Sequence, residues 1–203
     1  LLAPYLNEAG WLLSEGASIE QVDRVMVEFG MPMGPFRLLD EVGLDVARHA
    51  AETMHAAFGE RFRPSPGLAA LEHVNRLGRK GGSGFYRYED GRDQGVDASI
   101  YDALGEGVPA QRREMEPEVI RKRLLYAMVN EAARTLDDGI VQNAGDVDLG
   151  LITGTGFPPF RGGLLRWADR VGLDAIRERL DHWRVQLGER FEPAPSLASR
   201  GTF

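Results

Sequence analysis

The sequence contains no cysteine, so neither disulfide bonds nor thiolate metal sites can form. It also lacks the apolar run of about 20 residues that a membrane-spanning helix requires. Basic residues are the minority, with 24 Lys and Arg against 31 Asp and Glu, which gives a formal net charge of −7. Because such a balance repels a phosphate backbone, nucleic-acid binding is not expected as the main function.

Complete catalytic motifs are lacking as well. The four histidines form no His-Glu-x-x-His string, so no metal site is expected. Gly154-Thr155-Gly156 begins like a dinucleotide loop, but Pro159 occupies the place of its third glycine. Residues 81–84 lack the Lys-Ser/Thr ending of a phosphate loop, and Ser83 lacks the second glycine of a hydrolase elbow. We therefore expect that this chain alone is not a self-sufficient enzyme.

What the chain has in abundance is apolar spacing of three and four residues, which is typical of helices. Residues 2–13 form the first such stripe, and Ser18 begins a second helix. Further helices are predicted over residues 36–42 and 45–58. Because strand-like alternation is almost absent, the predicted fold class is mainly α. The helix over 45–58 is expected to bury Val46, Ala47, Ala50, Met54, Ala57 and Phe58.

A loop motif occurs twice. Residues 30–45 read GMPMGPFRLLDEVGLD, and residues 156–174 read GFPPFRGGLLRWADRVGLD. Each copy contains Gly-x-Pro, a glycine break, an apolar helix start and Val-Gly-Leu-Asp. Proline fixes φ and glycine admits positive φ, so each copy predicts a bent loop that leads into a helix. Asp40 and Asp169 recur in the two copies, and we interpret them as capping or hydrogen-bonding residues rather than catalytic ones.

The matches extend beyond the loops. Asn7-Glu8-Ala9 returns as Asn130-Glu131-Ala132, an offset of 123 residues. We interpret the chain as two tandem copies of one helical unit. The first copy spans residues 1–88 and the second residues 117–203. Residues 89–116 are polar and rich in glycine, and they are predicted to form a linker with a small helix at 98–104.

The repeated strings resemble a known family. LLAPYLNEA at residues 1–9, Pro32-Met33-Gly34-Pro35-Phe36, VGLD at 42–45 and residues 81–88 closely resemble the C-terminal domain of L-3-hydroxyacyl-CoA dehydrogenases. Residues 154–163 are similar to the last domain of the multifunctional fatty-acid oxidation α-subunit. The resemblance implies a fold similar to the C-terminal domain of 6-phosphogluconate dehydrogenase. A helical domain of that second dehydrogenase family is the weaker alternative.

The resemblance implies a reaction, the oxidation of a 3-hydroxyacyl-CoA to a 3-ketoacyl-CoA by hydride transfer to NAD. In the family, a His–Glu pair in an NAD domain acts as the base, and an Asn in an Asn-Arg-Leu-Leu opening helps to hold the substrate. Leu1-Leu2 match the two leucines, so all three groups are expected upstream of residue 1. NAD is expected to bind mainly to that absent domain, and a parent protein with enoyl-CoA hydratase (lyase) activity is implied.

The resemblance also assigns part of the acyl cleft to this chain. The residues expected to bind substrate are Pro32, Met33, Gly34, Pro35, Leu38 and Leu39. A loop of small residues allows a thioester to approach closely, and methionine offers an adaptable apolar surface. The second loop carries an extra Phe160-Arg161-Gly162, so a structural role is expected for residues 157–161.

The expected partners are an acyl-CoA substrate and the upstream NAD domain, in a bacterial cytoplasmic protein. A different hypothesis is that the tandem repeat acts chiefly as an assembly or dimerisation scaffold for a thiolase-type subunit or a second copy of itself. The altered second loop and the series Arg161, Arg166 and Arg170 favour that alternative. A charged substitution at Met33 distinguishes the two hypotheses.

Overall fold

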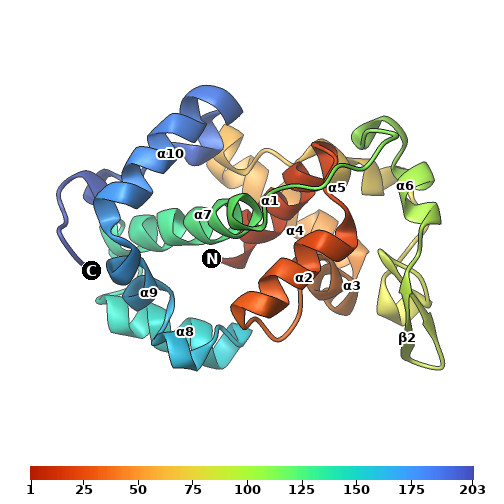
Figure 1. Ribbon diagram of the computed structural model, residues 1–203, viewed down its shortest axis with the longest axis horizontal. Coiled ribbons are helices and arrows are strands. Elements are labelled where there is room, and N and C mark those ends of the chain that lie inside the picture. Colours follow the sequence, from red (N-terminus) through yellow and green to blue (C-terminus); the bar gives the residue numbers. More distant parts are fainter.

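The computed structural model describes all 203 residues, Leu1–Phe203. Ten α-helices, several 3₁₀ turns and one two-stranded antiparallel hairpin make up the fold (Figure 1), which confirms the prediction of a mainly α protein. In chain order the helices are α1 (Leu2–Ser14), α2 (Ile19–Phe29), α3 (Pro35–Val42), α4 (Leu44–Phe58), α5 (Pro66–Ala69), α6 (Ser99–Leu104), α7 (Pro117–Asp137), α8 (Ala144–Thr155), α9 (Leu164–Val171) and α10 (Leu173–Leu187). The strands are β1 (Tyr86–Glu89) and β2 (Arg92–Val96).

Local signals in the sequence set the helix ends. The hydroxyl of Ser18 accepts a hydrogen bond from the amide of Gln21 at 3.2 Å, so it caps α2 as predicted. Gly30 ends the same helix with φ of 118°, a left-handed conformation that glycine adopts without strain. Pro35 occupies the first turn of α3, where no amide donor is needed. Each signal positions the loop of residues 30–35.

Helices α1 and α7 lie side by side in the middle of the molecule (Figure 1). Helices α2 and α3 pack on α1, while α9 and the last 3₁₀ turn pack on α7. One hydrophobic core of 42 buried residues runs through both sets. None of the helices combines the length and the apolar character that are needed to cross a membrane.

Residues 89–116 fold against the first part of the chain. They contain β2 and the predicted small helix, which forms as α6. Ile100 and Leu104 of α6 are buried, with exposed fractions of 0% and 2%. The hydroxyl of Tyr101 accepts a hydrogen bond from the amide of Ile19 at 3.0 Å. The segment is therefore anchored to the start of α2.

Helix α4 forms where it was predicted, but the prediction of its buried side was wrong. Leu44 is its only fully buried residue, whereas Val46 is 50% exposed and Phe58 is 47% exposed. Ala50 and Ala57 are exposed as well, and only Ala47 packs partly against the core. Helical spacing identifies the apolar side of a helix, but burial also requires a neighbouring element to cover that side. Helix α4 contacts α1, α3 and the 3₁₀ turns that follow it, but these elements leave most of its apolar side uncovered.

Candidate functional site

The first loop, residues 30–35, joins α2 to α3 and presents its middle to solvent. Met31 turns inward and is only 4% exposed, whereas Pro32 is exposed and Met33 is half-buried. The amide of Gly30 donates to the carbonyls of Met26 and Val27, so the loop begins from a fixed point. Met33 therefore lies on an open face and not inside the core.

Asp23 holds the end of this loop in place. Its buried carboxylate accepts hydrogen bonds from the amides of Phe36 and Arg37 at 2.9 and 3.0 Å, which caps the start of α3. The hydroxyl of Tyr86 donates to the same carboxylate at 2.8 Å. A Cβ atom at Gly34 would come within 2.2 Å of the Asp23 carboxyl carbon, so only glycine fits there. Burial raises the pKa of Asp23 to about 6, although its hydrogen bonds act in the opposite direction.

Asp40 performs a similar task at the other end of α3. It is fully buried and accepts hydrogen bonds from the amides of Phe85 and Tyr86 at 2.9 and 2.8 Å, and from the hydroxyl of Tyr88 at 3.1 Å. Burial raises the pKa of Asp40 to about 6. These contacts confirm the interpretation of Asp40 as a hydrogen-bonding residue. Asp169 likewise accepts from the amide of Phe203 at 2.9 Å.

The second loop, residues 156–163, contacts the first one. Phe157 is fully buried, and its ring lies edge-on to that of Phe29 at 5.8 Å. Arg161 donates from Nε to the carbonyl of Phe29 at 2.8 Å, and its guanidinium lies 3.9 Å above the Phe29 ring. A Cβ atom at Gly156 would come within 2.8 Å of Pro32. Phe157 and Arg161 thus make structural contacts of the kind expected for residues 157–161.

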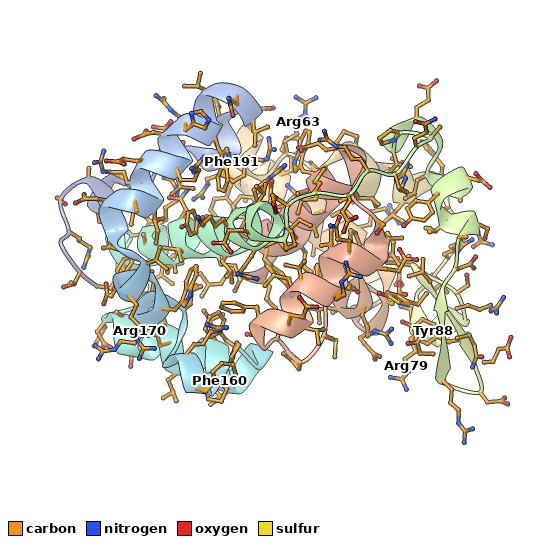
Figure 2. The ribbon with its side chains drawn as sticks, in the orientation of Figure 1. Arg63, Arg79, Tyr88, Phe160, Arg170 and Phe191 are labelled. Carbon is orange, nitrogen blue, oxygen red and sulfur yellow. The ribbon has the colours of Figure 1, made fainter.

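The three arginines of the series differ in exposure and contacts. Arg161 is engaged at the loop contact, whereas Arg166 and Arg170 are exposed. Phe160 is 72% exposed, and it lies with Arg170 at the periphery near α8 and α9 (Figure 2). No three His, Asp or Glu side chains converge in a way that could hold a metal ion.

An apolar groove lies beside α4, and we call it the α4 groove. It has a volume of about 320 Å³, and 13 of its 18 lining residues are hydrophobic. Helix α1 contributes Ala3 and Leu6, the end of α3 contributes Leu39, and α4 contributes Ala51 and Met54 among others. Sequence inspection missed this groove because it treated the apolar side of α4 as core.

The six residues predicted to bind substrate are unequal in exposure. Pro32 is exposed, and Met33 and Leu38 are half-buried. Gly34 and Pro35 are buried where the loop meets α3. Leu39 is 2% exposed and is the only one of the six that lines the α4 groove. Of the predicted residues, Pro32 and Met33 of the loop and Leu38 of α3 therefore reach solvent. Helix α3 leads from the loop towards the groove.

Reciprocal ion pairs join the two halves of the chain. Arg61 donates to Glu131 at 3.0 Å, and Arg190 donates to Glu8 at 2.8 Å. The tetrapeptide Gly-Glu-Arg-Phe at Gly59–Phe62 returns at residues 188–191 and supplies both arginines. That repeated tetrapeptide is the signal that could have revealed the pairs before the structure was known.

Two asparagines repeat the same contacts. Asn7 donates to the carbonyl of Arg63 at 2.9 Å and accepts from the amide of Ser65 at 2.8 Å. Asn130 donates to the carbonyl of Glu192 at 2.8 Å and accepts from the amide of Ala194 at 2.7 Å. Each asparagine therefore anchors the segment that follows the fourth helix of its own half.

A comparison with protein families matches residues 1–88 and 120–201 to the 3-hydroxyacyl-CoA dehydrogenase C-terminal domain. The chain belongs to this family. It is 44% identical over 202 residues to the fatty acid oxidation complex subunit alpha of a Shewanella species, and 40% identical over 200 residues to that of Vibrio cholerae. These alignments cover 97% and 98% of the chain but only 28% of each relative. The chain thus spans little more than a quarter of the curated relatives that it matches.

Solved structures show the same fold. The 3-hydroxybutyryl-CoA dehydrogenase from Escherichia coli superposes with a TM-score of 0.76 at 21% identity, covering 98% of this chain and 58% of that protein. The dehydrogenase part of multifunctional enzyme 1 from C. elegans gives a TM-score of 0.71 at 25% identity, covering 98% of this chain and 46% of the other.

Proposed function

We propose that this chain is the substrate-side part of an NAD-dependent L-3-hydroxyacyl-CoA dehydrogenase of fatty-acid β-oxidation. The family match supports the assignment. The observation that carries it is the first loop, whose exposed Pro32 and half-buried Met33 form an apolar surface on a rigid support. Such a surface suits the acyl thioester, which must be positioned and kept from water but needs no charged partner from this side.

The buried acids of this chain are not proposed as proton carriers. Asp23 and Asp40 each accept three hydrogen bonds that hold α3, so neither faces the open surface. We propose that groups outside residues 1–203 carry out the proton transfer of the reaction. We propose that this chain contributes positioning and the exclusion of water.

The residues of this chain do not fit NAD by themselves. A pyrophosphate prefers the N-terminus of a helix, where backbone amides are free. Gly154-Thr155-Gly156, which begins like a dinucleotide loop, instead lies at the C-terminal end of α8, where carbonyl groups are exposed. We therefore propose that a separate NAD domain of the complete protein binds the cofactor and is the first partner of this chain.

We also propose that the chain consists of two tandem copies, residues 1–88 and 117–203. The helices α1 to α4 and α7 to α10 follow one another in the same order, and the family model matches two stretches. The reciprocal pairs Arg61–Glu131 and Arg190–Glu8 support this proposal, since a two-fold interface places residue i against j and j against i.

The second copy is proposed to serve structure and not substrate. At the repeat offset of 123, Lys122 occupies the position of the asparagine in the family's Asn-Arg-Leu-Leu opening. The second loop is also occupied by its contacts with Phe29 and Pro32. A thiolase-type subunit or a second copy of this chain remains a proposed partner, and co-purification with the complete protein tests it.

Turnover of acetoacetyl-CoA with NADH tests the proposed function. We expect the complete polypeptide to catalyse the reaction and the 203-residue chain alone to be inactive. In the complete polypeptide, Met33→Glu should lower kcat/KM by about 100-fold or more, because the charge would face an apolar thioester. Leu149→Glu, a matched charge at a 61% exposed position on α8, should leave activity unchanged. Unchanged activity in Met33→Glu together with loss of assembly would favour the scaffold alternative.

A further inference from the structure

The fourth helices of the two proposed copies differ in the size of the side chains that face their neighbours. At an offset of 129, Ile176, Leu180 and Trp183 of α10 correspond to three residues of α4. Ile176 and Leu180 are fully buried, and Trp183 is only 7% exposed. The ring of Trp183 packs on that of Tyr126 of α7 at 5.9 Å. The second copy thus fills this space with its own side chains.

The first copy leaves the same space open. The residues of α4 that correspond to Ile176, Leu180 and Trp183 are Ala47, Ala51 and Met54, and all three line the α4 groove. Ala3 of α1 stands in the position of Tyr126, at the offset of 123, and lines the groove too. In each of these four pairs the first copy carries the smaller side chain. The groove is therefore a difference between two versions of one scaffold.

Three of the four polar side chains that line the groove, Asn7, Arg48 and Glu52, are already paired, and the fourth, Glu72, is exposed to solvent. Asn7 uses its amide on Arg63 and its oxygen on Ser65, as described above. Arg48 donates to Glu52 at 3.1 Å along α4. A ligand in the groove would thus find apolar surface and almost no free donor or acceptor, which favours a hydrocarbon.

The size of the groove favours a small molecule. A volume of about 320 Å³ lies at the lower end of the range for small-molecule pockets. A helix with its side chains is about 10 Å wide and would require a much larger trough. The groove also shares Leu39 with the predicted substrate-binding residues, and α3, about 12 Å long, leads from the groove to the first loop.

We propose that the α4 groove binds the distal part of the unbranched acyl chain of the substrate. This inference rests on the proposed function and adds to it a determinant of chain-length preference. The first loop holds the thioester end, and the groove between α1, α3, α4 and α5 holds the hydrocarbon that extends beyond it. Short substrates do not reach the groove, whereas long ones gain affinity from it.

Ala51→Leu tests the inference, because leucine is the residue that fills this position in the second copy. In the complete polypeptide, kcat/KM for a twelve-carbon 3-hydroxyacyl-CoA should fall about tenfold or more, whereas the value for the four-carbon substrate should stay the same. Ala57→Leu makes the same chemical change on the same helix at an exposed position outside the groove, and it should change neither value. Ala47→Val, a smaller change, provides a second variant if Ala51→Leu folds poorly.

Calorimetric binding to the 203-residue chain separates this inference from the proposed function. Dodecanoyl-CoA should bind more tightly than butyryl-CoA, and Ala51→Leu should abolish the difference. If the complete polypeptide oxidises no 3-hydroxyacyl-CoA while this length dependence persists, the proposed function fails and the groove assignment stands. Equal losses for both chain lengths would overturn the groove assignment. A change in assembly without a change in chain-length preference would overturn it too, because the groove would then hold another part of the polypeptide.

Discussion

The two halves of this chain share the contacts that define the backbone and differ in the surfaces that those contacts support. Asp23 caps α3 through two amides, and Asp148 caps α9 through the amides of Leu165 and Arg166 at 2.7 and 3.0 Å. In contrast, α10 buries its apolar side, while α4 leaves its apolar side open. The comparison teaches that one set of backbone contacts supports either a filled core or an open groove, depending on a few side-chain volumes.

The largest expected effect concerns the ion pairs that join the two halves of the chain. Glu8 is 2% exposed and accepts from Arg123 at 2.6 Å and from Arg190 at 2.8 Å. Glu8→Ala would leave the guanidinium of Arg190 without its counter-charge and that of Arg123 with Glu15 alone, so we expect a loss of about 3–5 kcal/mol in the free energy of unfolding. Urea denaturation measures it.

The counterpart Glu131 is the matched control. Its side chain is 13% exposed and pairs with Arg61, which is 22% exposed. Because water reaches this pair, Glu131→Ala should cost only about 1 kcal/mol. Equal losses for the two variants would show that the two sides of the interface contribute alike, contrary to the difference in burial.

The second comparison concerns the two capping aspartates and pH. Burial raises the pKa of Asp23 to about 6, above its ordinary value of 3.8, and it raises the pKa of Asp148 as well. Between pH values of about 4 and about 6, Asp23 binds more protons in the folded protein than in the unfolded chain. The contribution of Asp23 to stability therefore declines as the pH rises through this interval. The destabilisation caused by Asp23→Asn should therefore shrink by about 1–3 kcal/mol over that interval.

Asp148→Asn sharpens the same test. Asp148 is 9% exposed and Asp23 only 5%, so the carboxylate of Asp148 is less desolvated. Its variant should show a smaller change over the same pH interval. Urea denaturation at pH 4, 5 and 6 measures both variants. A destabilisation by Asp23→Asn that grows as the pH rises would contradict the raised pKa.

Sequence patterns predicted the parts of this fold that depend on local chemistry. The cap at Ser18, the break at Gly30 and the start at Pro35 all formed as predicted, because each acts within a few residues of itself. The exposed side of α4 was not predictable in that way. Whether Val46 is buried depends on an element from elsewhere that covers it, and helical spacing carries no information about such an element.

The candidate site, too, has parts that were predictable from local sequence patterns and parts that were not. The repeated loops were visible in the sequence, and their resemblance to a family led to the prediction that Met33 contacts substrate. The contact between the loops was not visible, since Arg161 and Phe29 are 132 residues apart. The groove was hidden for another reason: alanines at positions 47 and 51 are ordinary helix residues until they are set beside Ile176 and Leu180.

Arg161→Ala is the variant with the smallest expected effect, and it tests whether the second loop supports the first. Arg161→Ala removes the hydrogen bond to the Phe29 carbonyl and the contact with its ring, so it should lower the free energy of unfolding by about 1 kcal/mol. In the complete polypeptide it should also raise KM several-fold with little change in kcat, because Pro32 loses part of its support and the substrate surface becomes less ordered. Arg166→Ala, at an exposed arginine of α9 that makes no salt bridge, is the control and should change neither quantity. If Arg161→Ala lowers stability and leaves KM unchanged, the second loop stabilises the fold without positioning the first.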